Sequence, residues 1–372
     1  MNKLFYLVIF LISVWSGIEH PAAFAASIST GLLKAKQDAE AKGYVFVTSR
    51  DEIIAKAKQE GKLEELTFLG VEPRKAMIDA FKGKYPFLQV HAEDFSGTDQ
   101  YQRFIGELKA GLVKRWDTAH ISNHAYFEYP PYLKKFDVLG MAEQGVLNIP
   151  LQTIDPNHRN IVAKSSVVAL AAYNRNLISG EKVPGTWEGF LKPEFKGRKF
   201  AVDIRPNSIA NLVPAWGLEK TVEFGKKIAA QDPIWVRGQS RVLISVATGE
   251  YALYMGANLS TTLEAQAKNP TKSLDYKILD PVPVRPSAAV AILASAPHPY
   301  AALLWLEFQA SPEGQKILDK YGPADGTAFV PGTIQNTMIR GKSLSVMNYD
   351  THENLEDWVK KIVEAYGFPV AK

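Results

Sequence analysis

Predicted strands alternate with predicted helices along the first half of the chain, and this alternation limits the folds that it can adopt. Apolar runs of strand length occupy residues 66–71, 87–92 and 117–122, with an amphipathic helix predicted between each pair. Parallel strands need a long crossover connection, which a helix usually supplies. The spacing therefore predicts βαβ units around a parallel sheet, which is an α/β architecture.

The second half repeats the pattern. Strand-like runs at 167–173, 200–204, 251–255 and 276–283 again alternate with helical segments, and a mostly helical tail begins at Pro299. Because a domain commonly has roughly 100–200 residues, a chain of 372 residues is expected to form two α/β lobes.

Residues 1–25 have the pattern of a cleaved secretory signal. Lys3 supplies a positive charge, residues 4–15 are apolar, and Ala23-Phe24-Ala25 precede the expected cleavage site. A helix that spans a bilayer needs about 20 apolar residues, and polar Ser16 follows too soon. We therefore expect a mature chain that is exported to the periplasm.

The composition excludes several classes of protein. The chain has 43 Lys and Arg against 39 Asp and Glu, a net charge of +4, and no basic run. A charge so mild and dispersed does not indicate nucleic-acid binding. The absence of cysteine excludes disulfides, thiolate metal sites, a cysteine nucleophile and a lipoprotein anchor on an N-terminal cysteine.

Catalytic motifs are missing as well. The sequence has no Gly-x-Ser-x-Gly elbow, no His-Glu-x-x-His zinc motif and no phosphate-binding loop. Adjacent carboxylates such as Glu93-Asp94 and Glu356-Asp357 point apart, so we interpret them as charged surface. We predict that the chain is not an enzyme and has no cofactor. A periplasmic enzyme stays as the alternative of another class, because a fold does not fix a function.

A set of motifs follows in order from about residue 60 to residue 330. Val183-Pro-Gly-Thr-Trp187 with Pro193-Glu-Phe-Lys-Gly197 resembles a surface loop and helix of bacterial solute-binding proteins. Ala247-Thr-Gly-Glu250 and Ser311-Pro-Glu-Gly-Gln315 are similar to further segments of the same proteins. Together the motifs resemble the type II periplasmic binding proteins of ABC importers, in the branch that includes ferric-iron, phosphonate, thiamine and polyamine binders.

The resemblance implies two α/β lobes joined by two hinge strands, with a solute held in the cleft between them. The hinge strands would lie near Ser165–Tyr173 and Val284–Leu293. The implied partners are an ABC permease with its ATPase in the inner membrane, and a monomer is expected. The expected division is a signal peptide at 1–25, lobe 1 at 26–168, lobe 2 at 169–284, and a return of the chain to lobe 1 at 285–372.

Candidate binding residues in lobe 1 follow the predicted strands. Ligands of parallel sheets bind beyond the carboxyl ends of the strands, so polar residues at these ends are expected on one rim. They are Glu72, Ser96, Thr98, Ser122, Asn123 and His124.

Candidate binding residues in lobe 2 include the turn Asn207-Ser208 before a predicted helix. In the resembled family this turn holds an anion or the oxygens of the ligand, and free N–H groups at a helix N-terminus suit phosphate, phosphonate or carboxylate. A plain N-cap explains the two residues equally well. Gln239 and Asn258 lie where the family carries cleft amides. Arg205 and Arg237 could clamp a carboxylate, although exposed surface is their commoner environment.

Ferric iron is the alternative ligand, because iron-binding members belong to the resembled branch. Iron needs phenolate or carboxylate oxygens, but the positions where those members place a tyrosine pair are Leu259 and Ser260 here. His120 and His124 fall across a strand end rather than on one helix face, so we predict no metal site from them. The prediction is a substrate-binding component that captures a small polar, anionic organic or phosphorus-containing solute.

Overall fold

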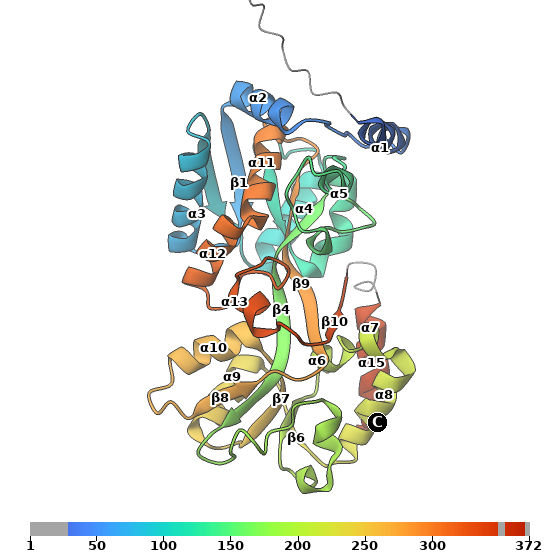
Figure 1. The fold of residues 1–372 in the computed structure, drawn as a ribbon, viewed down its shortest axis with the longest axis vertical. Coiled ribbons are helices and arrows are strands. Elements are labelled where there is room, and N and C mark those ends of the chain that lie inside the picture. The colour runs from blue at the N-terminus through green and yellow to red at the C-terminus, as the bar shows by residue number, and fades with distance from the viewer. Residues whose placement is uncertain (1–28, 349–353, 369–372) are drawn as a thin grey trace, which may run out of the picture.

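The computed structural model describes residues 29–348 and 354–368 (Figure 1). The predicted signal peptide at 1–25 lies outside these residues. In the described ranges no helix combines the length and the apolar character that crossing a membrane requires.

Helices and strands alternate along most of the chain. The helices are α1 (Thr30–Ala41), α2 (Arg50–Glu60), α3 (Val71–Lys84), α4 (Thr98–Lys109), η1 (Asn123–Glu128), η2 (Pro130–Tyr132), α5 (Val138–Glu143), η3 (Leu151–Thr153), η4 (Glu188–Leu191), η5 (Pro193–Phe195), α6 (Asn207–Ala210), α7 (Val213–Trp216), α8 (Leu218–Ala229), α9 (Gln239–Thr248), α10 (Leu259–Ala267), α11 (Pro299–Ala310), α12 (Pro312–Tyr321), α13 (Ile334–Met338) and α15 (Leu355–Tyr366). The strands are β1 (Lys62–Thr67), β2 (Gln89–Asp94), β3 (Thr118–Ile121), β4 (Ile161–Asn174), β5 (Ala201–Asp203), β6 (Ile234–Val236), β7 (Leu253–Asn258), β8 (Leu274–Lys277), β9 (Val282–Ile292) and β10 (Leu344–Val346).

Two lobes are stacked along the long axis of the molecule, and the long strands β4 and β9 run from one into the other (Figure 1). The strand order is β2-β1-β3-β9-β4-β7-β5-β6, with β8 beside β4 and β10 beside β9. The predicted two-lobed α/β fold is confirmed. The β4 and β9 strands pair in antiparallel fashion from Ile161 opposite Ala291 to Val168 opposite Val284.

Strand direction is parallel in the outer part of each lobe. The β1 strand pairs in parallel with β2 and with β3, and β5 pairs in parallel with β6 and with β7. The carboxyl ends of β5, β6 and β7 therefore lie at a common edge of lobe 2, where the connecting turns can form a site.

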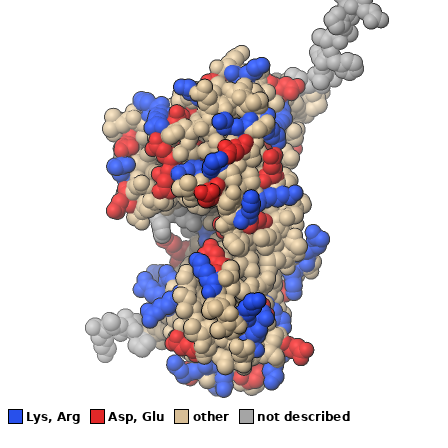
Figure 2. Space-filling model, turned by 90° about the vertical axis from the view of Figure 1, so that its left-hand side faces the viewer, with Lys and Arg blue, Asp and Glu red and all other residues tan. Residues whose placement is uncertain are grey.

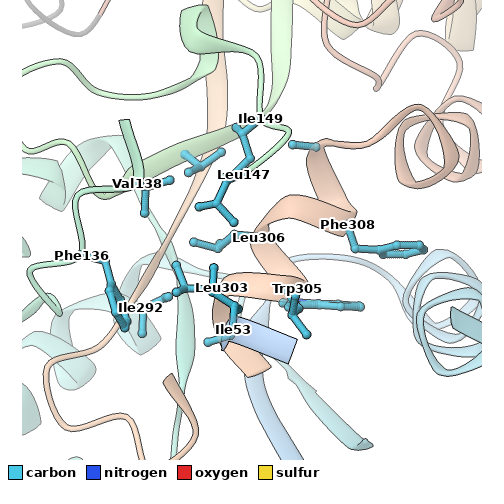
Figure 3. Packing of buried hydrophobic residues seen from close by; sticks show 14 of the residues in the cluster. Ile53, Phe136, Val138, Leu147, Ile149, Ile292, Leu303, Trp305, Leu306 and Phe308 are labelled. Atoms are coloured by element: carbon cyan, nitrogen blue, oxygen red, sulfur yellow. The ribbon is translucent and has the colours of Figure 1, made fainter. Parts of the chain in front are cut away.

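Helices cover both faces of the sheet in each lobe. In lobe 1 the helix α11 lies in the core, where its own Leu303 and Ile53 of α2 are completely buried (Figure 3). The Trp305 ring makes an edge contact with Phe81 at a centroid distance of 4.8 Å. The α11 helix is apolar on nearly all sides because other elements surround it.

The first strand lies earlier than the apolar run at 66–71 predicts. The β1 strand is Lys62–Thr67, and Val71 instead begins α3, where its side chain is exposed. The charged residues Glu64 and Glu65 interrupt the apolar pattern, so the sequence did not indicate a strand at these positions. Glu65 is nevertheless fully buried, because Gln309 and Lys164 compensate its carboxylate.

The C-terminal helix α15 also departs from the expected division. Residues 285–372 were expected in lobe 1, but α15 packs against α8 and α6 of lobe 2 (Figure 1). Ile362 and Tyr366 belong to the same buried cluster as Phe224 and Ile228 of α8. The cause is the strongly one-sided apolar face of α15, which the amphipathic helix α8 matches.

Candidate functional site

A cavity of about 620 Å³ lies between the lobes, and most of its wall is built by lobe 2. The surface is visibly hollowed between the two lobes (Figure 2). The wall of the cavity consists of the ends of β5 and β7, the start of α9, the crossing strands, one residue of η1 and the first turn of α15. The lining residues are Phe127, Val167, Val202, Asp203, Arg205, Pro206, Asn207, Ser208, Ile209, Asn211, Gln239, Met255, Gly256, Asn258, Arg285, Leu355, Glu356 and Val359.

Asp203, the last residue of β5, holds two turns of the cavity wall in place. Its carboxylate accepts hydrogen bonds from the backbone N–H of Arg205 at 2.9 Å and of Gly238 at 3.2 Å. It also pairs with the Arg205 guanidinium at 3.3 Å, and this contact raises the pKa of Arg205. Arg205 thus lines the cavity with its charge already compensated.

Gln239, the first residue of α9, connects α9 to the end of β7. Its side-chain oxygen accepts a hydrogen bond from the Asn258 backbone N–H at 3.1 Å, and its nitrogen donates to the Gly256 carbonyl at 3.2 Å. The amide therefore positions the wall. Direct contact of Gln239 with the solute stays a prediction.

The Asn207-Ser208 turn lines the cavity but does not cap a helix in the expected way. The helix α6 has only four residues, and its N-cap position is Pro206, with no side-chain cap. The Ser208 hydroxyl instead donates to the Gly256 carbonyl at 2.7 Å. The Asn207 side chain is exposed at the cavity.

Arg285 brings a positive charge into the wall from the crossing strand β9. It lies opposite Val167 of β4 in the strand register, and Val167 lines the cavity too. Phe127 of η1 adds an aromatic side chain from lobe 1, and 55% of its surface is exposed. The sequence analysis did not single out Arg285. An arginine inside the apolar run Val282-Pro-Val-Arg-Pro286 is the signal that could have indicated it.

Glu356 has a position that the sequence did not indicate. The pair Glu356-Asp357 was interpreted as charged surface, and both residues are exposed, but Glu356 also lines the cavity together with Leu355 and Val359. The helix spacing places these three residues on one side of the first turns of α15. Sequence reasoning missed them because α15 is far from the other lining residues along the chain.

Four of the predicted rim residues of lobe 1 are not among the described residues that line this cavity. Glu72 is exposed in the first turn of α3, and Thr98 is exposed as the first residue of α4. The Ser96 hydroxyl donates to Asp94 at 2.8 Å, and Ser122 is buried after β3. Contact of these four with a solute remains a prediction. Asn123 and His124 lie in η1, and their side chains are not among those that the structure describes.

Metal ligands do not gather among the described residues, which contain no group of three His, Cys, Asp or Glu side chains suited to a metal ion. His120 packs on Phe68 with ring centroids 4.6 Å apart, and its Nδ1 lies 3.0 Å from the Ala289 carbonyl. Burial, with the nearby Lys164, lowers the pKa of His120 to about 3, so its ring stays neutral. Leu259 is fully buried, as is Tyr254.

Two tryptophans of lobe 2, Trp216 and Trp235, pack away from the cavity. The Trp216 ring contacts Phe224 at 5.2 Å, and the Trp235 ring contacts Tyr366 at 4.7 Å. Both belong to the packing around the α8 and α15 pair.

A two-lobed α/β fold with a cavity at the strand ends of one lobe is typical of solute-binding proteins. The chain belongs to the family described as bacterial extracellular solute-binding protein, whose sequence profile matches residues 121–354, more than half of the chain. The resemblance inferred from the motifs is therefore confirmed. No curated protein matches the chain.

Solved structures share the fold at low sequence identity. Ferric iron-binding protein A of Mannheimia haemolytica in an open conformation is 16% identical, with a TM-score of 0.64 over 83% of this chain and all of that protein. Apo FutA2 of Synechocystis is 16% identical, with a TM-score of 0.63 over 82% and 98% of the two chains. The Trichodesmium protein IdiA (FutA), solved with iron and citrate, is 17% identical, with a TM-score of 0.62 over 83% and 100%. At these identities the likeness establishes the type II fold.

Proposed function

We propose that the chain is the periplasmic substrate-binding component of an ABC importer, and that it binds a small anionic organic or phosphorus-containing solute between its lobes. The single observation that carries the ligand class is the position of Arg285, an arginine of the crossing strand β9 that lines the cavity. A guanidinium binds carboxylate and phosphate oxygens with two parallel hydrogen bonds. Asn207, Ser208 and Asn258 of the same wall supply neutral polar groups for the remaining oxygens.

The crossing strands give the proposed capture its mechanism. A solute that contacts Arg285 and the lobe 2 turns on one side, and lobe 1 on the other, favours the arrangement in which both lobes touch it. Its binding shifts the population toward that arrangement by the difference in affinity between the two arrangements. We propose that the rim residues Ser122 and His124 of lobe 1 contact the solute in this closed state.

Family membership supports the proposed partners. A solute-binding protein delivers its ligand to a membrane permease that an ATPase drives, and the predicted signal at residues 1–25 would bring this chain to the periplasm, where such a permease receives it. We propose that the chain binds and releases its solute unchanged, as a monomer.

Ferric iron is the second candidate, because structural neighbours are named as ferric iron-binding or are solved with iron. What supports the anionic solute over iron is the composition of the wall. The lining residues include no Tyr and no His among the described residues, and phenolate and imidazole are groups that iron sites use.

Native mass spectrometry tests the proposal. The full chain is expressed with its own leader, purified from the periplasm without chelator, and weighed before and after unfolding and refolding. We expect a mass excess that disappears on refolding, with no stoichiometric iron by elemental analysis. Arg285→Gln should lose most of this excess, whereas Arg175→Gln, whose guanidinium pairs with Asp275 away from the cavity, should keep it. Stoichiometric iron, or the absence of any excess, would contradict the proposed ligand class.

A further inference from the structure

The C-terminal helix α15 forms part of the cavity wall although it lies beyond the segment that the family profile matches. It is firmly attached to lobe 2. Ile362 is fully buried against Gly225 of α8, where an added Cβ would lie 2.9 Å from the Ile362 side chain. The Tyr366 ring contacts the Trp235 ring in a tilted arrangement, with the centroids 4.7 Å apart. The first turn of α15 therefore has a fixed position at the cavity.

The two carboxylates of this first turn have different surroundings. Asp357 pairs with Lys361 one turn later at 2.7 Å, and it does not line the cavity. Glu356 lines the cavity, and no ion pair within the described part of the chain includes it. A helix N-terminus favours both carboxylates equally, so helix stability alone does not explain why one of them borders the cavity.

The charges of the wall are of both signs. Asp203 and Arg205 compensate each other. The other charged lining residues are Arg285 and Glu356. In a partly enclosed cavity, opposite charges attract more strongly than on an open surface. Leu355 and Val359, which flank Glu356 on α15, give the wall an apolar surface for the carbon skeleton of a ligand.

We infer that Glu356 selects solutes that carry a cationic amino group in addition to their anionic group, so that the ligand is a small zwitterion. This inference depends on the proposed function, since it assigns the anionic end of the same ligand to Arg285 and the lobe 2 turns. A solute with only negative charge meets repulsion from the Glu356 carboxylate, whereas an ammonium group of the same skeleton is attracted.

Two probe pairs that differ only in an amino group test the inference by titration calorimetry with the full-length mature protein. They are 3-aminopropylphosphonate with propylphosphonate, and 4-aminobutyrate with butyrate. We expect the wild-type protein to bind the amino member of at least one pair about tenfold more tightly. Glu356→Gln should reduce this preference to about threefold or less. The matched control Asp357→Asn, in the same helix turn, should keep the wild-type preference.

The ligand released from protein purified from the periplasm gives a second, independent readout. Acetylation with acetic anhydride should add one acetyl mass if the ligand has a primary amine. Equal preferences in the wild-type and Glu356→Gln proteins, or a released anion that cannot be acetylated, would overturn the zwitterion inference and leave the anionic-solute proposal intact. Released iron, or no binding of any probe and no released ligand, would contradict both.

Discussion

The Ser208 hydroxyl donates a 2.7 Å hydrogen bond to the carbonyl oxygen of Gly256, and this contact joins the segment that follows β5 to strand β7. The two residues are so close that a Cβ on residue 256 would lie 3.0 Å from Ser208 Cβ. Gly256 also has a φ of +88°, which L side chains rarely adopt. The cavity wall at this point therefore depends on a glycine.

We predict that Gly256→Ala destabilises the protein by about 1–3 kcal/mol and weakens binding of the solute that copurifies with it. The new methyl group strains the backbone and pushes Ser208 away from β7. Gly249→Ala is the control, because Gly249 has a similar φ of +87° but its nearest contacts would be 3.7 Å away, at the end of α9. Urea unfolding and calorimetry should show both variants destabilised and only Gly256→Ala impaired in binding. Equal affinities for the two variants would contradict the proposed role of this contact.

A second prediction concerns Glu65 and Lys164, a buried ion pair at the base of lobe 1. The Lys164 Nζ lies 3.7 Å from a Glu65 oxygen, both side chains are almost completely buried, and Gln309 donates to the same carboxylate at 2.9 Å. Lys164→Met leaves the carboxylate buried without its cation, so we expect a loss of about 3–5 kcal/mol in the free energy of unfolding.

The double variant Lys164→Met with Glu65→Gln should recover most of this loss, because no charge then stays buried. Lys220→Met serves as the control for the lysine substitution, since Lys220 pairs with Glu188 at 3.1 Å on the exposed surface. The Lys220→Met substitution should lower the free energy of unfolding by at most about 1 kcal/mol. A double variant as unstable as Lys164→Met would indicate that the lysine acts through packing rather than through its charge.

A third prediction gives a pH dependence to stability. Burial, with the neighbouring carboxylates Glu264 and Asp319, raises the pKa of Asp325 from 3.8 to about 6. The folded protein therefore holds this proton at pH values where the unfolded chain has released it. The free energy of unfolding should fall as the pH rises from about 4 to about 6, by up to roughly 3 kcal/mol, and stay lower above that range.

Asp325→Asn should remove this dependence and make the protein more stable than wild type at pH 8. Glu264→Gln removes one of the charges that raise the pKa of Asp325, so it should shift the drop in stability to lower pH. Urea unfolding at several pH values from 4 to 8 measures both effects. Identical pH profiles for wild type and Asp325→Asn would show that other groups determine the dependence.

The order of elements could be predicted from the sequence, but the wall of the cavity only in part. Hydrophobic periodicity and the motifs indicated two α/β lobes, because these signals are local in the chain. The turn Asn207-Ser208, which comes after β5, was recognised from its place in the chain, whereas Asn258, the last residue of β7, was proposed from the family resemblance; all three line the cavity. Arg285 and Glu356 were missed, because they reach the cavity only through tertiary packing of β9 and α15.

Side-chain roles were harder to predict than positions. Gln239 does border the cavity, yet its amide is already bonded to the backbone of Asn258 and Gly256. A charged residue such as Glu65 is not expected in a buried strand. Its partners Gln309 and Lys164, which are distant in the sequence, explain why it is tolerated there. Both cases depend on partners that no spacing rule connects to the residue.

A final prediction separates the two functions of Asp203, which are to hold the turns and to compensate Arg205. Asp203→Ala removes the acceptor for the backbone N–H groups of Arg205 and Gly238, and a backbone donor that loses its partner costs about 1–3 kcal/mol where it is buried. Arg205→Gln removes only the ion pair, whose guanidinium side is about half exposed, and it should cost less than about 1 kcal/mol. Urea unfolding should therefore show a clearly larger loss for Asp203→Ala, and calorimetry a larger fall in solute affinity. Equal losses of stability would mean that the ion pair, rather than the two backbone hydrogen bonds, holds this side of the cavity together.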